Sequence, residues 1–203
     1  NKKTIINDND IVIYTDGACI NNGTKKARAG IGVHFSNRNI YKFDDISEEI
    51  HVPNPTNNVA ELSAILKVNR LLKEYSNKLI IYTDSEYCIN CITQWYPQWV
   101  KTNKLKNKIN IELIKPLYQY YLSKNIEYRH IKSHTGLQDE HSLGNAQADN
   151  LASYSIPSRS TLNLFSIDSL FSSNKEELLP HERSSLAWLI TSASLRARAP
   201  PFP

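Results

Sequence analysis

Methionine is absent from this chain of 203 residues, and cysteine and glycine are scarce, with three and six copies. A small, odd number of cysteines does not suit a disulfide framework and favours a reducing, intracellular compartment. No apolar run approaches the roughly 20 residues that a membrane-spanning helix needs, and no signal-peptide pattern opens the chain. Because an initiator methionine is also missing, we expect the native protein to begin upstream of residue 1.

A strong charge of either sign is missing too, since 24 basic residues against 20 acidic ones leave a net charge of +4. The charge is unevenly distributed, because residues 101–110 contain four lysines and no acid. A basic run beside tryptophans can bind a polyanionic backbone, or it can be the solvated face of a helix. Cys88 and Cys91 form a single Cys-x-x-Cys pair. We interpret this pair as two small buried helix residues rather than as a zinc or redox site.

Apolar stretches typical of β-strands recur along the chain. They occupy residues 10–15, 29–35, 39–46, 79–83 and 126–131. An Asn-Asn-Gly turn at residues 21–23 is expected to join the first two strands as an antiparallel pair. Residues 47–55, which include two prolines, are expected to form a loop.

Helical periodicity alternates with the later strands. It begins at Thr56, a suitable N-cap, and returns over residues 85–96, 110–122 and 145–155. The combined order predicts an α/β fold with a five-stranded mixed sheet, antiparallel over its first three strands and then parallel, with helices on both faces. We expect residues 1–156 to form this domain. The serine-rich remainder, residues 157–203, is expected to be a mobile tail or an artificial extension.

Two of the predicted strands break at the same motif, a Thr-Asp pair followed by a small residue, at Asp16 and Asp84. A buried strand that ends in aspartate places its carboxylate at the edge where open α/β sheets bind ligands. Glu61 and Asp149 lie on predicted helices that can pack over this edge. Taken singly, each acid could belong to a turn, a cap or a solvated helix face. Together they suggest oxygen ligands that converge on a hard cation.

Clustered carboxylates repel one another strongly unless cations neutralise them. Two of them about 4 Å apart repel by roughly 4 kcal/mol at an effective dielectric of 20. Ligation by oxygen alone favours Mg²⁺ or Mn²⁺ over zinc, and a pair of such ions can promote phosphodiester hydrolysis. His134 follows the last predicted strand in a glycine-containing loop. It could move protons beside the acidic cluster, or it could be an ordinary surface histidine.

Several short segments of the sequence match the motifs of a known family. They are Tyr14-Thr15-Asp16-Gly17, Ala29-Gly30-Ile31-Gly32, Thr56-Asn57-Asn58-Val59-Ala60-Glu61-Leu62, Tyr82-Thr83-Asp84-Ser85, His134-Thr135-Gly136 and Gly144-Asn145-Ala146-Gln147-Ala148-Asp149-Asn150-Leu151-Ala152. In this order and spacing, residues 10–155 resemble ribonuclease H of type 1, the enzymes of cells and some large viruses. The resemblance implies the ribonuclease H-like fold. It also implies a site whose metal ligands are the carboxylates Asp16, Glu61, Asp84 and Asp149.

Further roles follow from the resemblance alone. It implies two Mg²⁺ ions, with Mn²⁺ as a possible substitute, and it implies that His134 assists proton transfer and product release. By position, Cys19, Asn22, Asn57 and Asn58 are similar to residues that approach the 2′-hydroxyls of RNA, and Thr56 and Asn110 are similar to a phosphate pocket for the DNA strand. Residues 95–110 resemble the basic protrusion of the family, with Trp95 and Trp99 as a wall for deoxyribose and Lys101, Lys104 and Lys106 against phosphates.

The resemblance therefore predicts a monomeric endonuclease that hydrolyses the RNA strand of RNA–DNA hybrids and leaves 5′-phosphate and 3′-hydroxyl ends. Two alternatives stay open: a catalytically silent binding module on the same scaffold, and another nuclease of this fold such as a junction resolvase or integrase core. The chain departs from shorter family members by about five additional residues, including 137–141, before the last aspartate. This difference affects the expected placement of the loop, but it leaves the acidic residues in place.

Overall fold

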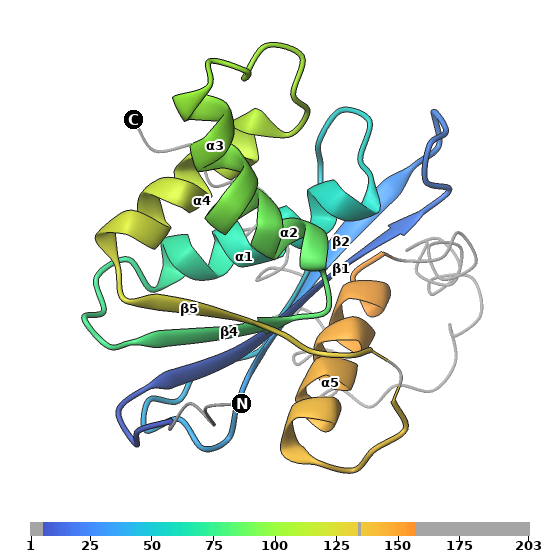
Figure 1. Ribbon diagram of the computed structural model, residues 1–203. Coiled ribbons are helices and arrows are strands. Elements are labelled where there is room, and N and C mark those ends of the chain that lie inside the picture. The colour runs from blue at the N-terminus through green and yellow to red at the C-terminus, as the bar shows by residue number, and fades with distance from the viewer. Residues whose placement is uncertain (1–5, 134, 157–203) are drawn as a thin grey trace, which may run out of the picture. The chain divides into compact units, whose positions relative to one another are not determined.

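A five-stranded mixed sheet organises the part of the chain that the computed structural model describes, residues 6–133 and 135–156. The strands lie in the order β3-β2-β1-β4-β5 (Figure 1). Their bounds are β1 Ile11–Ile20, β2 Arg28–Phe35, β3 Ile46–Ile50, β4 Leu79–Thr83 and β5 Ile126–His130. The pairs β1–β2 and β2–β3 are antiparallel, whereas β1–β4 and β4–β5 are parallel. The predicted mixed topology is confirmed.

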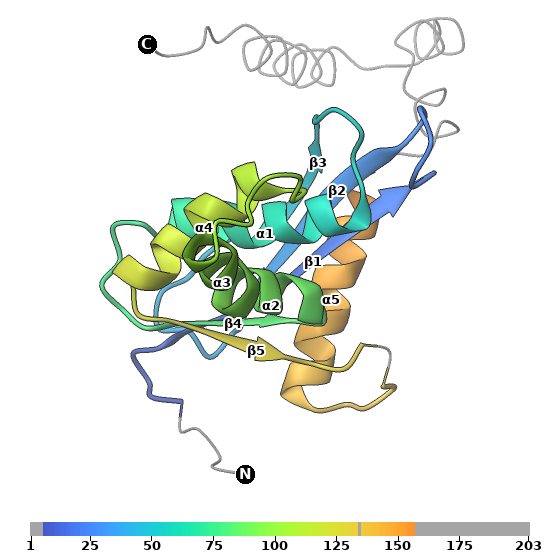
Figure 2. The same cartoon turned by 45° about the horizontal axis from the view of Figure 1, so that its top comes forward.

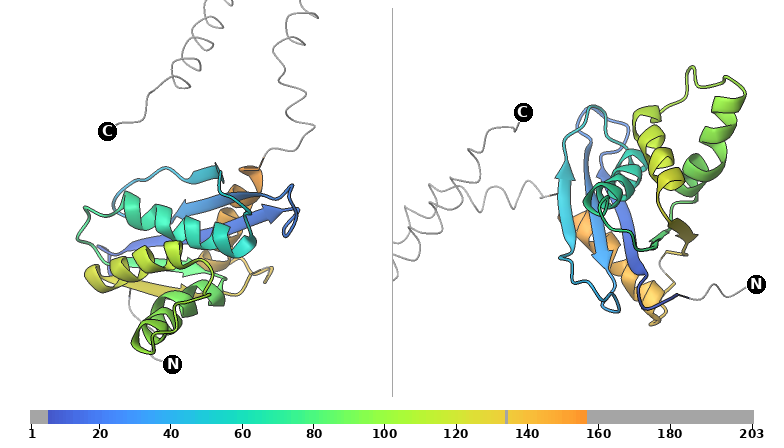
Figure 3. Two further views of the ribbon diagram at one scale, coloured as in Figure 1. Left: turned by 90° about the horizontal axis from the view of Figure 1, so that it is seen from above. Right: turned by 90° about the vertical axis from the view of Figure 1, so that its left-hand side faces the viewer.

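Helices cover both faces of this sheet, as the sequence predicts. Their bounds are α1 Asn57–Leu71, α2 Glu86–Asn90, the π-helical segment η1 Cys91–Trp95, α3 Tyr96–Lys101, α4 Ile111–Ser123 and α5 Glu140–Tyr154. Figures 1, 2 and 3 show α5 on one face and the other helices on the opposite face. Among the helices described, none is long and apolar enough to span a membrane.

The alternation of side chains along β1 explains how one strand supports two apolar layers. Ile11 and Ile13 belong to the large core under α1 and α4, whereas Val12 and Tyr14 belong to a smaller cluster that includes Ala148 of α5. Successive strand residues point to opposite faces, so a strand that is covered on both sides reads as a continuous apolar run. β1 therefore lies between α1 and α4 on one face of the sheet and α5 on the other.

The third strand lies later in the chain than the sequence suggested. Residues 39–45 are not a strand, and β3 instead occupies residues 46–50, where a loop was expected. The side chain of Asn39 binds the backbone of Val12 at both N and O, at 2.8 and 2.9 Å. The carboxylate of Asp45 accepts a hydrogen bond from the backbone N of Phe35 at 3.0 Å. These hydrogen bonds anchor residues 39–45 as a loop. The charged β3 lies at the edge of the sheet, a position that tolerates acidic residues.

Three other element boundaries differ from the sequence prediction. β1 runs to Ile20, well beyond residue 15, because its second half pairs with β2. The helix expected to end near residue 96 continues through η1 and α3 to Lys101. α5 begins at Glu140 rather than at residue 145, because the Asp139 carboxylate accepts hydrogen bonds from the backbone N of His141 and Ser142, both at 3.1 Å. The predicted tail, residues 157–203, lies outside the described residues.

Candidate metal centre and nucleic-acid interface

The acidic centre forms where β1 extends past its parallel neighbour. The parallel ladder of β1 and β4 reaches Tyr14 and Tyr82, and the aspartates Asp16 and Asp84 follow two residues later on each chain segment. The sequence suggested that Asp16 ends its strand. The structure instead places Asp16 inside β1, because β1 continues its pairing with β2. Glu61 reaches the same place from α1. One oxygen from each of Asp16, Glu61 and Asp84 lies within 4.8 Å of the others.

Two glycines allow the helices to approach this part of β1 from both faces. A Cβ atom on Gly17 would clash with the backbone N of Glu61, so α1 could not pack as it does. Gly32 on β2 pairs with Asp16, and a Cβ atom there would clash with the backbone O of Ala148 in α5. The sequence indicated a close backbone approach for the glycines of the second strand, which is confirmed, but it did not indicate the role of Gly17.

Burial and mutual repulsion shape the electrostatics of the centre. Burial raises the pKa of Asp16 from 3.8 to about 8, assisted by the charges of Asp84, Asp149 and Glu61 and opposed by a hydrogen bond from the backbone N of Gly17 at 2.7 Å. Burial also raises the pKa of the Glu61 carboxyl. Without cations, this group of acids does not carry its full negative charge at neutral pH. A set of oxygen ligands that repel one another in this way fits Mg²⁺ or Mn²⁺.

The other two predicted catalytic residues, Asp149 and His134, are not part of this group of three acids. Asp149 lies on α5, half-buried, and outside the group of three oxygens that can share one ion, although its charge contributes to the raised pKa of Asp16. Asp149 is therefore near the centre without completing it in this arrangement. His134 lies outside the described residues.

Glu61 has a partner that the sequence analysis missed. The hydroxyl of Ser85 donates a hydrogen bond to Oε2 of Glu61, and the thiol of Cys88 donates to the same oxygen at 3.7 Å. Ser85 also caps α2 by accepting from the backbone N of Cys88 at 3.3 Å. Cys88 and Cys91 are both buried and free, which agrees with the interpretation as small helix residues. No local signal reveals the contact with Glu61, because the two residues are 24 positions apart in the sequence.

Several residues expected to contact the hybrid lie at the start of α1 or beside it. Thr56 caps this helix, and its hydroxyl accepts from the backbone N of Val59 at 3.2 Å. Asn57 is exposed and Asn58 half-buried in the first turn. The thiol of Cys19, near the end of β1, lies 3.5 Å from the backbone O of Pro55. The structure thus places Cys19 beside the segment that leads into α1.

Asn22 and Asn110 lie in connecting segments outside the helices and strands. Asn22 is exposed in the turn that follows β1. Asn110 adopts a left-handed backbone conformation with φ 61° immediately before α4, and its amide donates to the hydroxyl of Tyr87 at 3.2 Å. Thr56 and Asn110 therefore each stand at the N-terminus of a helix, a position that favours phosphate groups.

The two tryptophans of the predicted protrusion pack partly against the core. Trp95 and Trp99 are half-buried against the main core, with ring centroids 6.3 Å apart. Trp95 also meets the ring of Tyr87 edge-on at 5.9 Å, and the ammonium group of Lys108 lies 4.7 Å from the centre of the Trp99 ring.

The lysines of the same protrusion remain available for ligands. Lys101, Lys104 and Lys106 are exposed, and within the described part of the chain they form no ion pair. Exposed lysines beside partly exposed tryptophans can bind a polyanionic backbone.

The strand order, the helices on both faces and the acids at the β1–β4 edge together define the ribonuclease H-like class of α/β proteins. A sequence model of the family described as RNase H matches residues 8–156. Ribonuclease H1 of Rattus norvegicus is 36% identical over 148 residues, which cover 70% of this chain and 48% of the relative. Ribonuclease H of Rickettsia typhi is 36% identical over 151 residues, which cover 71% of this chain and 90% of the relative. The chain belongs to the ribonuclease H family.

Related structures agree with this membership. The RNase H domain of prototype foamy virus matches with a TM-score of 0.58 and 26% identity, covering 71% of this chain and 93% of that domain. LC11-RNase H1, isolated from compost, matches with a TM-score of 0.52 and 25% identity, covering 73% of this chain and 96% of that protein. The chain spans about half the length of several relatives that it matches, including the rat protein.

Proposed function

We propose that this protein is a metal-dependent endoribonuclease that hydrolyses the RNA strand of RNA–DNA hybrids and acts as a monomer. The observation that carries the proposal is the convergence of Asp16, Glu61 and Asp84, whose oxygens lie within 4.8 Å of one another at the sheet edge. A protein that only binds nucleic acid would gain nothing from acids that repel the phosphates of its ligand. Relatives named Ribonuclease H and Ribonuclease H1 support the same activity.

In this proposal Asp16, Glu61 and Asp84 hold divalent cations, and Asp149 joins them from α5. Two Mg²⁺ ions, with Mn²⁺ as a substitute, would supply Lewis acidity for the attacking water and the departing oxygen. Ser85 keeps the Glu61 carboxylate oriented through its hydrogen bond. Attack of water in line with the departing 3′-oxygen yields a 5′-phosphate and a 3′-hydroxyl without a covalent enzyme intermediate. His134 assists proton transfer and product release.

Substrate recognition is proposed to use the surfaces on both sides of the centre. Asn22, Asn57 and Asn58, with the backbone at Cys19, would contact 2′-hydroxyls, which only RNA presents. Thr56 and Asn110, each at a helix N-terminus, would hold a DNA phosphate.

The protrusion would contact the DNA strand beyond that phosphate. Trp95 and Trp99 would pack against deoxyribose, and Lys101, Lys104 and Lys106 would neutralise phosphates. Their exposed positions and the half-buried tryptophans support this assignment.

A gel assay with one labelled RNA strand tests the proposal directly. The strand is presented as an RNA–DNA hybrid and as duplex RNA, and a DNA strand of the same sequence is presented in duplex DNA, each with Mg²⁺ and with EDTA. We expect cleavage of the hybrid alone, dependent on Mg²⁺, with products that carry 5′-phosphate and 3′-hydroxyl ends. Binding of the hybrid without cleavage would assign the chain as a silent binding module, and cleavage of duplex DNA would assign it as another nuclease of this fold.

A further inference from the structure

The turn between β1 and β2 carries two positive charges that the proposed catalytic site does not use. Lys25 and Lys26 are exposed at its tip, and within the described residues neither forms an ion pair. Arg28, at the base of the turn, is engaged with Glu49, with Nε and Nη2 donating to the two carboxylate oxygens at 2.7 and 2.8 Å. The carboxylate of Glu49 is thus paired with Arg28, and the tip of the turn presents Lys25 and Lys26 as a cationic surface.

Hydrogen bonds within the turn hold this tip in one shape. The hydroxyl of Thr24 donates to the backbone O of Asn21 at 2.8 Å and accepts from the backbone N of Lys26 at 3.1 Å. The backbone N of Ala27 donates to the O of Thr24 at 3.1 Å. Asn21 and Gly23 adopt left-handed conformations, with φ 53° and 78°, which complete the turn. A preorganised backbone leaves only the lysine side chains to be ordered when a ligand binds.

The turn is a direct continuation of the strand that carries Asp16. Ile20, the end of β1, lies four positions after Asp16, and at about 3.3 Å per residue this distance is roughly 13 Å. A duplex advances about 3.4 Å per base pair, so the tip lies at least about four base pairs from the acidic centre. Figure 1 shows this turn and the loop after α3 extending from the same side of the molecule at separate places.

We propose that Lys25 and Lys26 bind phosphates of the RNA strand several base pairs away from the scissile bond. The inference rests on the proposed function, because it assumes that a hybrid lies over the acidic centre. Asn22 in the same turn and Cys19 on β1 are among the residues assigned to 2′-hydroxyls, so the strand that passes this turn is the RNA strand. The protein then binds the hybrid with two cationic arms, one on either side of the acidic centre. The arm formed by Lys25 and Lys26 contacts the RNA strand, and the protrusion contacts the DNA strand.

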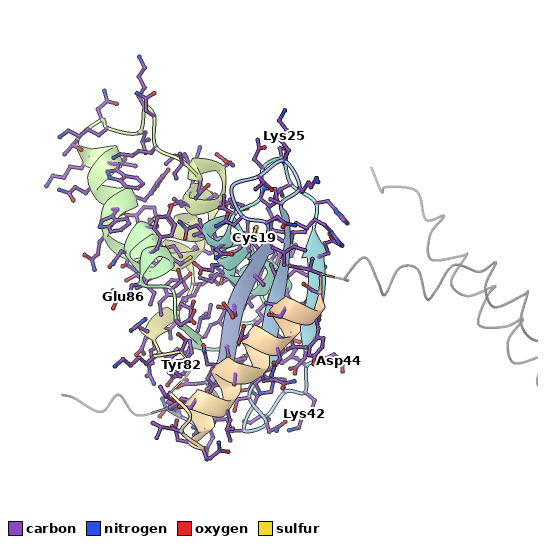
Figure 4. All side chains as sticks on the ribbon, turned by 90° about the vertical axis from the view of Figure 1, so that its right-hand side faces the viewer. Cys19, Lys25, Lys42, Asp44, Tyr82 and Glu86 are labelled. Atoms are coloured by element: carbon purple, nitrogen blue, oxygen red, sulfur yellow. The ribbon has the colours of Figure 1, made fainter. Side chains whose placement is uncertain are left out.

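The experiment compares two double variants that each remove two positive charges. Lys25→Ala/Lys26→Ala removes the proposed arm, and Lys42→Ala/Lys73→Ala removes exposed lysines elsewhere. Figure 4 shows Lys42 at the opposite end of the molecule from Lys25. Hybrid affinity is measured over a range of salt concentrations with all proteins carrying Asp84→Asn to prevent cleavage. Each lost phosphate contact lowers the slope of log affinity against log salt by about 0.9, so we expect the first variant to lose about 1.8 and the second to keep the parent slope.

A second measurement identifies the strand. Hybrids are prepared in which only the RNA strand or only the DNA strand is shortened on one side of a single cleavage site. Shortening the RNA strand on the side of the arm should lower kcat/KM of the protein with intact lysines and leave that of Lys25→Ala/Lys26→Ala unchanged. Equal slopes for the two double variants, or sensitivity confined to the DNA strand, would overturn the inference while hybrid cleavage itself continues. Failure of the proposed function would instead appear as no preference for hybrid in any variant.

Discussion

Ser85 links two helices at the acidic edge: its hydroxyl donates to Oε2 of Glu61 on α1, and its oxygen accepts from the backbone N of Cys88 in the first turn of α2. One small side chain thus caps a helix and orients a candidate metal ligand. Burial raises the pKa of the Glu61 carboxyl, and the hydrogen bond from Ser85 opposes that rise. The contact therefore favours the ionised form that a cation requires.

Replacing Ser85 by alanine should weaken both functions. We expect Ser85→Ala to lower the free energy of unfolding by about 1 kcal/mol through the lost cap. We also expect it to weaken Mn²⁺ binding measured by calorimetry, because Glu61 loses its hydroxyl partner and keeps only the thiol of Cys88. Ser85→Thr, which keeps the hydroxyl, is the matched control and should retain most of both. If Ser85→Ala binds Mn²⁺ as tightly as the parent protein, the serine serves only as a cap.

Asp84 should be required for cleavage and not for binding. Asp84→Asn removes one charged oxygen from the group that can share an ion, so hybrid cleavage should fall by several orders of magnitude. Hybrid affinity should stay close to that of the parent, because the loss of a negative charge does not repel phosphate. Asp44→Asn, at an exposed loop position, is the control for a simple change in charge. Cleavage near the parent rate would remove Asp84 from the ligand set.

Without divalent ions, stability should depend on pH through Asp16. Its pKa in the folded protein, about 8, lies above the ordinary value of 3.8, so the folded state keeps a proton that the unfolded chain releases. The resulting stabilisation is complete below about pH 4 and is lost as the pH rises toward about 8.

Urea denaturation in EDTA at several pH values measures this effect. The urea midpoint of the parent protein should fall from about pH 5 to about pH 8, and that of Asp16→Asn should fall less. Added Mg²⁺ should raise the midpoint most at the higher pH, where the carboxylates can ionise. Parallel curves for the two proteins would mean that Asp16 does not hold the extra proton.

The basic protrusion should determine a large part of the salt dependence of binding. Replacing Lys101, Lys104 and Lys106 by alanine should lower the salt slope of hybrid affinity by up to about 2.7, at about 0.9 for each phosphate contact. The comparison is made per lysine removed against the Lys42→Ala/Lys73→Ala variant. An unaltered slope would show that these lysines are solvated surface residues that do not contact phosphates.

His141 should stabilise the attachment of α5 to the sheet. Its Nδ1 lies 2.9 Å from the hydroxyl of Tyr14, and its ring stacks on Tyr82 with centroids 4.4 Å apart. We expect His141→Ala to lower the free energy of unfolding by about 1–3 kcal/mol, because it leaves the hydroxyl of the buried Tyr14 without this partner.

A double-mutant cycle isolates that contact. Tyr14→Phe combined with His141→Ala should cost less than the sum of the two single variants, since the unpaired hydroxyl is then removed. Leu143→Ala, at an exposed position of α5, serves as the control for the helix. Strict additivity would show that the hydrogen bond contributes nothing to stability.

The elements whose signals lie within contiguous residues were predictable. The apolar run of β4, covered on both faces, and the cap Thr56 appear where the sequence places them. The acidic residues were also found from the sequence, because a strand or helix assignment is enough to direct Asp16, Asp84 and Glu61 toward one edge. Their roles in catalysis stay predictions.

Partners distant in the chain decided the rest. β1 extends beyond Asp16 because Arg28 and its neighbours offer a strand to pair with, and residues 39–45 become a loop because Asn39 finds the backbone of Val12. The sequence alone therefore located four of the five strands and the acids that could bind a cation, since periodicity and capping are local. Only the tertiary structure decided how close those acids stand and which hydroxyl holds Glu61, because such contacts depend on the packing of helices against both faces of the sheet.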